Sequence, residues 1–162
     1  MNIRLRIFLL LFCFFLVVPT VTRAQGSQTF EQSLVTLTNQ DRLEAGVLPL
    51  TESTLLSTAA QEKADDMVKE GYFAHTSPLG ISPWHWITAV GYHYTHAGEN
   101  LAMHFDDPTG LEAAWMASPL HRTNIVRNVY AQVGFGVASG IYQGQQTTFV
   151  VELFATPASK TL

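Results

Sequence analysis

The feature that most constrains the fold is an alternation of bulky and small residues near the C-terminus, QVGFGVAS at 132–139. The pattern predicts a strand with valine and phenylalanine on one face and glycine or alanine on the other. A strand with one bare face lets a neighbouring layer approach closely. After a predicted turn at 140–146, TTFVVELFA at 147–155 is a second strand-like segment, so we expect the two to form a hairpin.

Helical patterns come before these strands. Thr29 and Gln32 have capping-box spacing at the start of a helix predicted over 29–45. The clearest helix is predicted over 51–70, where an apolar stripe runs opposite acids and lysines that we expect to be solvated. Shorter elements are a loop at 74–83, helices at 84–90, 108–117 and 120–125, and an extended segment at 91–105. Helices first and strands last, without βαβ alternation, favour an α+β fold with helices on an antiparallel sheet.

The first 24 residues have the three regions of a secretory signal peptide. Arg4 and Arg6 precede an apolar run at 7–18, and a small-x-small cleavage site ends at Ala24. The run is too short for a comfortable membrane span, although an uncleaved N-terminal anchor is the alternative. We expect residues 1–24 to be a signal peptide cleaved near Ala24. Residues 25–162 are then a single secreted domain, extracellular or periplasmic, with no transmembrane segment.

The predicted mature chain is acidic and lacks cysteine. It keeps six basic and thirteen acidic residues, a formal net charge of −7, and Cys13 is removed with the signal peptide. Nucleic acid is an unfavourable partner for such a chain, because phosphates require a basic surface. Without disulfides the domain must be stabilised by its core, and 138 residues are enough for one.

No HExxH, GxSxG, phosphate-loop or GxGxxG motif occurs, so attention falls on histidine and glutamate. The segment HAGENLAMH at 96–104 places Glu99 between His96 and His104. In a strand, both histidines point to one face and Glu99 to the other, so these three residues do not form a local metal site. If Glu99 is functional, its partners come from elsewhere in the chain.

Two histidines outside this segment are the candidates. His75 lies in a loop after the strongest helix, and His121 follows the proline break in WMASPLHRTN. For either one alone, a structural, hydrogen-bonded imidazole is the alternative. Glu152 interrupts the apolar strand, and we expect it on an exposed or edge face, with a buried carboxylate paired to a histidine as the alternative.

Four segments together resemble the CAP superfamily of cysteine-rich secretory, antigen 5 and pathogenesis-related proteins, particularly its bacterial, SCP-like branch. The resemblance covers the whole predicted mature chain, in order. The segments are NQDRLEAGVLPL (39–50), YFAHTSPLG (72–80), GENLA (98–102) and WMASPLHRTNIV (115–126), followed by VYAQVGFGVA (129–138). The resemblance implies a three-layer α-β-α sandwich with a central antiparallel sheet.

Eukaryotic members of that family have a cavity lined by two histidines and two glutamates. His75 and Glu99 match the first of each, whereas Ser118 stands at the second glutamate position and Val129 at the second histidine position. We infer that His121, three residues after Ser118, takes over the second imidazole role.

The resemblance leaves three hypotheses of function. The first is a secreted binding module whose cavity contains His75, Glu99 and His121, which could hold a divalent ion such as zinc. Its ligand would be a small molecule or a cell-envelope or host-surface component. The second is a metal-assisted hydrolase or peptidase with Glu99 as general base, aided by His75. The third is a structural network without a ligand. Ser118, Asn100 and Trp115 are expected at the edge of the cavity.

Overall fold

The computed structural model describes residues 28–159, so the predicted signal peptide lies outside the described residues. In this range the chain forms five helices and four strands. Every helix among residues 28–159 is too short or too polar to cross a membrane. In chain order the elements are α1 (Phe30–Glu44), β1 (Thr51–Glu52), α2 (Thr54–Glu70), α3 (Pro83–Ala89), β2 (Tyr94–Met103), α4 (Pro108–Ala117), α5 (Pro119–Ile125), β3 (Gln132–Tyr142) and β4 (Gln145–Pro157).

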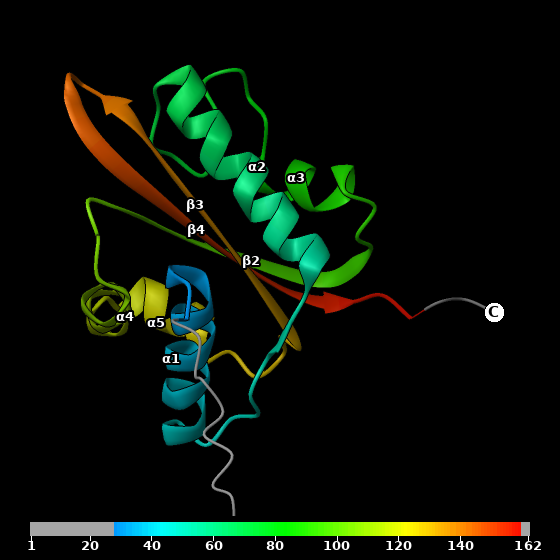
Figure 1. Cartoon of the computed structure of the whole chain (residues 1–162). Coiled ribbons are helices and arrows are strands. Elements are labelled where there is room, and N and C mark those ends of the chain that lie inside the picture. Colours follow the sequence, from blue (N-terminus) through cyan, green and yellow to red (C-terminus); the bar gives the residue numbers. More distant parts are fainter. Residues whose placement is uncertain (1–27, 160–162) are drawn as a thin grey trace, which may run out of the picture.

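The strands form one sheet in the order β1-β3-β4-β2. The three long strands are antiparallel, as expected, and the two-residue β1 adds a parallel pair to β3, so the sheet is mixed. Helices α2 and α3 cover one face of the sheet, while α1, α4 and α5 cover the other (Figure 1). The fold is therefore α+β with three layers, and β2 is an edge strand.

The helix ends follow local sequence signals. The predicted capping box is present at α1, where the Thr29 side chain accepts from Gln32 N and the Gln32 side chain accepts from Thr29 N. Ser53 caps α2, and Gly71 ends it in the left-handed conformation, with φ of 68°. The helix predicted from residue 51 starts three residues later, because Thr51 and Glu52 pair with β3.

The bare face of β3 is in close contact with α2, as the sequence predicts. A Cβ atom at Gly134 would overlap the backbone of Leu56 and Ser57, and one at Gly136 would overlap the backbone of Ala60 and Gln61. The missing side chains therefore set the distance between the α2 layer and the sheet.

Alternation along the strands produces a separate apolar core on each face of the sheet. Both cores include residues of β2 and β4, so these strands have a helical layer on each side. The core under α2 includes Leu56, Met67, Leu101, Val151 and Leu153, and the core under α1 and α4 includes Leu34, Leu111, Trp115, Val150 and Phe154.

The β3–β4 hairpin has a shorter turn than the predicted 140–146. Pairing continues to Tyr142 and Gln145, which leaves a two-residue loop. Both loop residues have positive φ, 50° at Gln143 and 81° at Gly144. Such turns match the twist of the flanking strands, so pairing extends almost to the tip of the hairpin.

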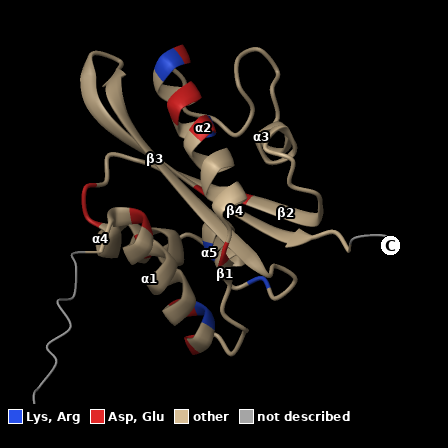
Figure 2. Ribbon diagram, turned by 45° about the vertical axis from the view of Figure 1, so that its right-hand side comes forward, with Lys and Arg blue, Asp and Glu red and all other residues tan. Residues whose placement is uncertain are grey.

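Charged positions lie mainly on the helices and loops (Figure 2). The expectation that every lysine of α2 is solvated is wrong for Lys63, which is 0% exposed. The chain after α2 folds back over this position, so that the Tyr72 hydroxyl and the carbonyls of Ala74 and His75 surround the ammonium group. A buried charge on this face is therefore part of the fold.

Gly134→Ala tests the close approach of α2 and β3. The new methyl group has no space, so we expect it to lower the free energy of unfolding by roughly 1–3 kcal/mol, the usual cost of overpacking. Chemical denaturation measures this difference. Ser139→Ala, at an exposed position of the same strand, is the control, and equal stability of the two variants would contradict this account of the layer spacing.

Candidate functional site

Two of the predicted residues, His75 and Glu99, are in direct contact. Glu99 lies on the edge strand β2, and His75 lies in the loop between α2 and α3. His75 Nδ1 is 2.6 Å from Glu99 Oε1. The glutamate side chain is only 2% exposed, whereas the imidazole is 61% exposed. An ionised carboxylate can only accept, so Nδ1 carries the proton and Nε2 is left for another partner.

Burial and charge act in opposite directions on this pair. Burial raises the pKa of Glu99, while the hydrogen bond from His75 and the positive charge of Lys63 lower it, with burial the larger effect. The hydrogen bond to Glu99 raises the pKa of His75. Glu99 is thus a buried acceptor that stabilises the protonated imidazole.

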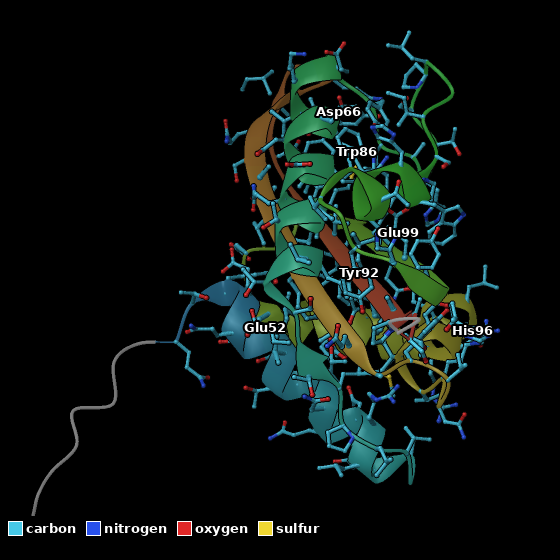
Figure 3. All side chains as sticks on the ribbon, turned by 90° about the vertical axis from the view of Figure 1, so that its right-hand side faces the viewer. Glu52, Asp66, Trp86, Tyr92, His96 and Glu99 are labelled. Carbon is cyan, nitrogen blue, oxygen red and sulfur yellow. The ribbon has the colours of Figure 1, made fainter. Side chains whose placement is uncertain are left out.

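Glu99 Oε2 is a buried oxygen without a hydrogen-bond partner. In the described part of the chain, only Trp86 Nε1 shares this condition among buried side-chain nitrogens and oxygens. Figure 3 shows Glu99 on β2 and Trp86 on α3, with His96 farther along β2 and directed outward. Buried polar atoms are normally paired, so an unpaired acceptor in this position indicates a site for a donor group.

A pocket of about 490 Å³ opens beside the pair. The His75 loop and the start of α3 form one wall, and the end of α5 with the segment that follows it forms the other. Part of β2 lies between the walls. The lining residues are His75, Thr76, Ser82, Pro83, Trp84, Ala97, Gly98, Glu99, Asn124, Arg127 and Tyr130.

The other predicted residues do not line this pocket. His121 lies on α5, where its Nδ1 is 2.9 Å from Ser118 Oγ and its ring centroid is 6.4 Å from that of Trp115. Burial, and to a smaller extent the charge of His75, lower the pKa of His121. In residues 28–159, no group of three His, Cys, Asp or Glu side chains is placed to hold a metal ion.

Sequence reasoning missed the wall that carries Asn124, Arg127 and Tyr130. Tyr130 Oη donates to Ala97 O at 3.1 Å, and Asn124 Nδ2 donates to Glu99 O at 3.1 Å. Trp115 Nε1 donates to Leu101 O at 3.3 Å. These bonds satisfy alternate carbonyls of the edge strand, which would otherwise be open to another strand. Asn124 lies three residues after His121, a helical spacing that could have marked it.

Asn100 faces away from the pocket because neighbouring strand residues point to opposite faces. Its Nδ2 is 2.9 Å from Glu152 Oε2 and 3.3 Å from His121 O. Glu152 is 0% exposed, so the expectation of an exposed or edge position is wrong. Its strand, β4, is paired on both sides and covered by helices on both faces. Its side-chain partners are Asn100 and Thr38, not a histidine.

Glu152 belongs to a buried cluster with Glu112 and Thr38. Thr38 Oγ1 lies 3.2 Å from both oxygens of Glu112 and 3.2 Å from Glu152 Oε1. The Thr38 hydroxyl has one proton for two carboxylates, of which Glu152 also accepts from Asn100, so protonation of one carboxyl would supply the missing donor. Burial raises the pKa of Glu112 to about 8, and burial with the charge of Glu112 raises the pKa of Glu152 well above its ordinary value.

Comparisons with known proteins agree with the fold. The model of the cysteine-rich secretory protein (CAP) family matches residues 35–154. The uncharacterized protein YkwD of Bacillus subtilis is 38% identical over 129 residues, which are 78% of this chain and 50% of that protein. The chain therefore spans only half the length of this curated relative.

Several solved structures share the fold. An extracellular protein containing an SCP domain from Bacillus anthracis has a TM-score of 0.66 at 24% identity, covering 78% of this chain and 40% of that one. An outer surface protein of Borrelia burgdorferi has a TM-score of 0.67 at 19% identity, covering 78% and 92%. NaASP2, whose structure was solved with Zn²⁺, has a TM-score of 0.55 at 14% identity, covering 81% and 82%.

Glu99→Gln tests the coupling of His75 to the buried carboxylate. We expect the pKa of His75, followed by NMR of its ring protons, to fall toward the ordinary value of about 6.5. Because the folded-state pKa of His75 is raised, its contribution to stability is full below the unfolded-state value and disappears as pH rises through the folded-state value. Glu62→Gln, at an exposed position of α2, is the control. An unchanged His75 titration in Glu99→Gln would refute the coupling.

Glu112→Gln tests the protonated acid cluster. A raised pKa makes the native state bind more protons than the unfolded state, so stability falls as pH rises from about 4.5 to about 8. The wild type should lose up to about 1.4 kcal/mol per pH unit relative to Glu112→Gln in this window. Denaturation at several pH values measures the difference, with Glu44→Gln as the exposed control on α1. If the free energy of unfolding depended on pH in the same way for wild type and Glu112→Gln, the Glu112–Glu152 pair would not bind an additional proton in the native state.

Proposed function

The chain belongs to the CAP family of cysteine-rich secretory proteins, and on that premise we propose that it is a secreted binding module with its ligand site at His75 and Glu99. Residues 1–24 would direct export and be cleaved near Ala24. The observation that carries the proposal is the pocket beside a buried, half-satisfied carboxylate. The exposed imidazole of His75 is the group directly available to a ligand, and the unpaired Glu99 oxygen lies buried behind it.

The lining favours a small polar ligand, or the polar end of a cell-envelope or host-surface component. Arg127 supplies donors and His75 can present Nε2, whereas both amide hydrogens of Asn124 are already donated to Glu99 O and Asn100 Oδ1. Trp84, 38% exposed, offers an apolar surface at the same pocket. A ligand of matching chemistry has an apolar ring face and several hydroxyl or amide groups, as an amino sugar does.

A divalent cation such as zinc is a second candidate, with a changed role for Glu99. The Nδ1 atoms of His75 and His121 are bonded to Glu99 and Ser118, which leaves both Nε2 atoms as candidate ligands. Metal-binding histidines typically use their other nitrogen on a carboxylate or similar acceptor in this way. Glu99 would then orient His75 instead of coordinating the ion, and a bound zinc would supply Lewis acidity.

The geometry does not favour the hydrolase hypothesis with Glu99 as general base. That carboxylate is 2% exposed, and one oxygen is bonded to His75, so it has little access to a substrate proton. The structural-network hypothesis accounts for Asn100 and Glu152, but it leaves Glu99 Oε2 without a partner.

Two probes, N-acetylglucosamine oligomers and zinc chloride, test the site separately on ¹⁵N-labelled residues 25–162. We expect at least one to shift the amide resonances of pocket residues. His75→Ala should weaken that binding at least about tenfold, equivalent to about 1.4 kcal/mol. Loss of zinc binding in His121→Ala as well would support the two-imidazole site.

Glu62→Gln is the matched control, since this residue is exposed and lines a different groove. It should bind each probe as the wild type does. If neither probe shifts the pocket resonances, or if His75→Ala binds both probes unchanged, the proposed site is refuted. Hydrolysis of a probe that requires His75 would instead favour an enzyme.

A further inference from the structure

We propose that Lys63 is the positioning residue of this site: its ammonium group fixes the backbone on both sides of His75. The inference rests on the proposed function in so far as His75 is the residue that the site uses. Lys63 does not line the pocket, so it would act through the loop.

The ammonium group of Lys63 donates all its hydrogen bonds to acceptors within the protein. Its Nζ lies 3.0 Å from each of three acceptors, Tyr72 Oη, Ala74 O and His75 O. An ammonium group has three donor hydrogens, so this set is complete. Nζ also lies 4.7 Å from the centroid of the Tyr72 ring, and Tyr72 Oη donates to Asp66 Oδ2 at 2.6 Å. Burying a lysine is costly, and this one is fully paired.

The two carbonyl acceptors bracket His75. The carbonyl of Ala74 belongs to the peptide group that precedes His75. The carbonyl of His75 belongs to the peptide group that follows it. Bonds to both restrict the orientation of the two peptide planes and hence the direction of the His75 side chain. This restriction accounts for a largely exposed imidazole that still meets Glu99 at 2.6 Å.

The charge of Lys63 also acts on the pair through space. Burial lowers the pKa of Lys63 and raises that of Glu99, and the opposite charges of the two groups oppose both shifts. Lys63 also lowers the pKa of His75. The charge of Lys63 therefore opposes the effect of burial on Glu99, the residue that accepts the hydrogen bond of His75.

Lys63→Met, followed by NMR titration of His75, separates positioning from charge alone. Losing only the charge would raise the pKa of His75, because Lys63 lowers it. Losing the position as well breaks the contact with Glu99, which is the largest cause of the raised value, so we expect the pKa of His75 to fall toward about 6.5. An unchanged or raised pKa would overturn the proposal.

Tyr72→Phe is the matched control, because it removes one of the three acceptors of Lys63 and keeps both carbonyl bonds. It should leave the titration of His75 as in the wild type, whereas a fall equal to that of Lys63→Met would overturn the proposal by showing a general effect of disturbing the cluster. The His75 titration of both variants is measured without a ligand. The positioning role of Lys63 can therefore fail while the pocket still binds a probe, and the pocket can fail to bind a probe while Lys63 still positions His75.

A measurement on the wild type covers the case in which Lys63→Met does not fold. Scalar couplings across hydrogen bonds can be sought between ¹⁵N-labelled Lys63 Nζ and the carbonyl carbons of Ala74 and His75. We expect both couplings, with slow exchange of the ammonium protons. A resolved Lys63 ammonium resonance without either coupling would overturn the proposal.

Discussion

The constraint on which the site depends is the burial of a carboxylate at the edge of the sheet. Glu99 is 2% exposed, and an ionised group in such a place requires hydrogen bonds and a compensating charge. His75 supplies one hydrogen bond and Lys63 a nearby charge. The loop after α2 must therefore fold back over the sheet edge, and this places an imidazole at the mouth of the pocket.

The opposite wall of the pocket is also held by a buried cationic side chain that donates hydrogen bonds to backbone carbonyls. Arg42 of α1, 1% exposed, donates to Ile125 O at 2.6 Å, Arg127 O at 3.1 Å and Tyr130 O at 3.5 Å. Lys63 and Arg42 thus each bind backbone carbonyls of one pocket wall from opposite helical layers. Loops held in this way are rigid supports for a binding site, without the disulfides common in small secreted domains.

Periodicity predicted much of the fold, because it reports local burial. The capping box at Thr29, the bare face of β3 and the helix at 108–117 follow directly from residue spacing. Buried charge is not visible in this way. Lys63 and Glu152 look like surface residues until a distant loop or two neighbouring strands cover them. The sequence likewise indicated His75 and Glu99, whereas the wall with Arg127 and Tyr130 depends on tertiary contacts made by Arg42.

The central claim is that Glu99 orients His75 so that Nε2 faces possible ligands. Its most direct test is the tautomer of His75, read from long-range ¹H–¹⁵N correlation spectra of residues 25–162 at a pH above the titration of this histidine. The account predicts a protonated Nδ1 and an unprotonated Nε2, because Nδ1 lies 2.6 Å from a carboxylate oxygen. A dominant tautomer with the proton on Nε2 would contradict it.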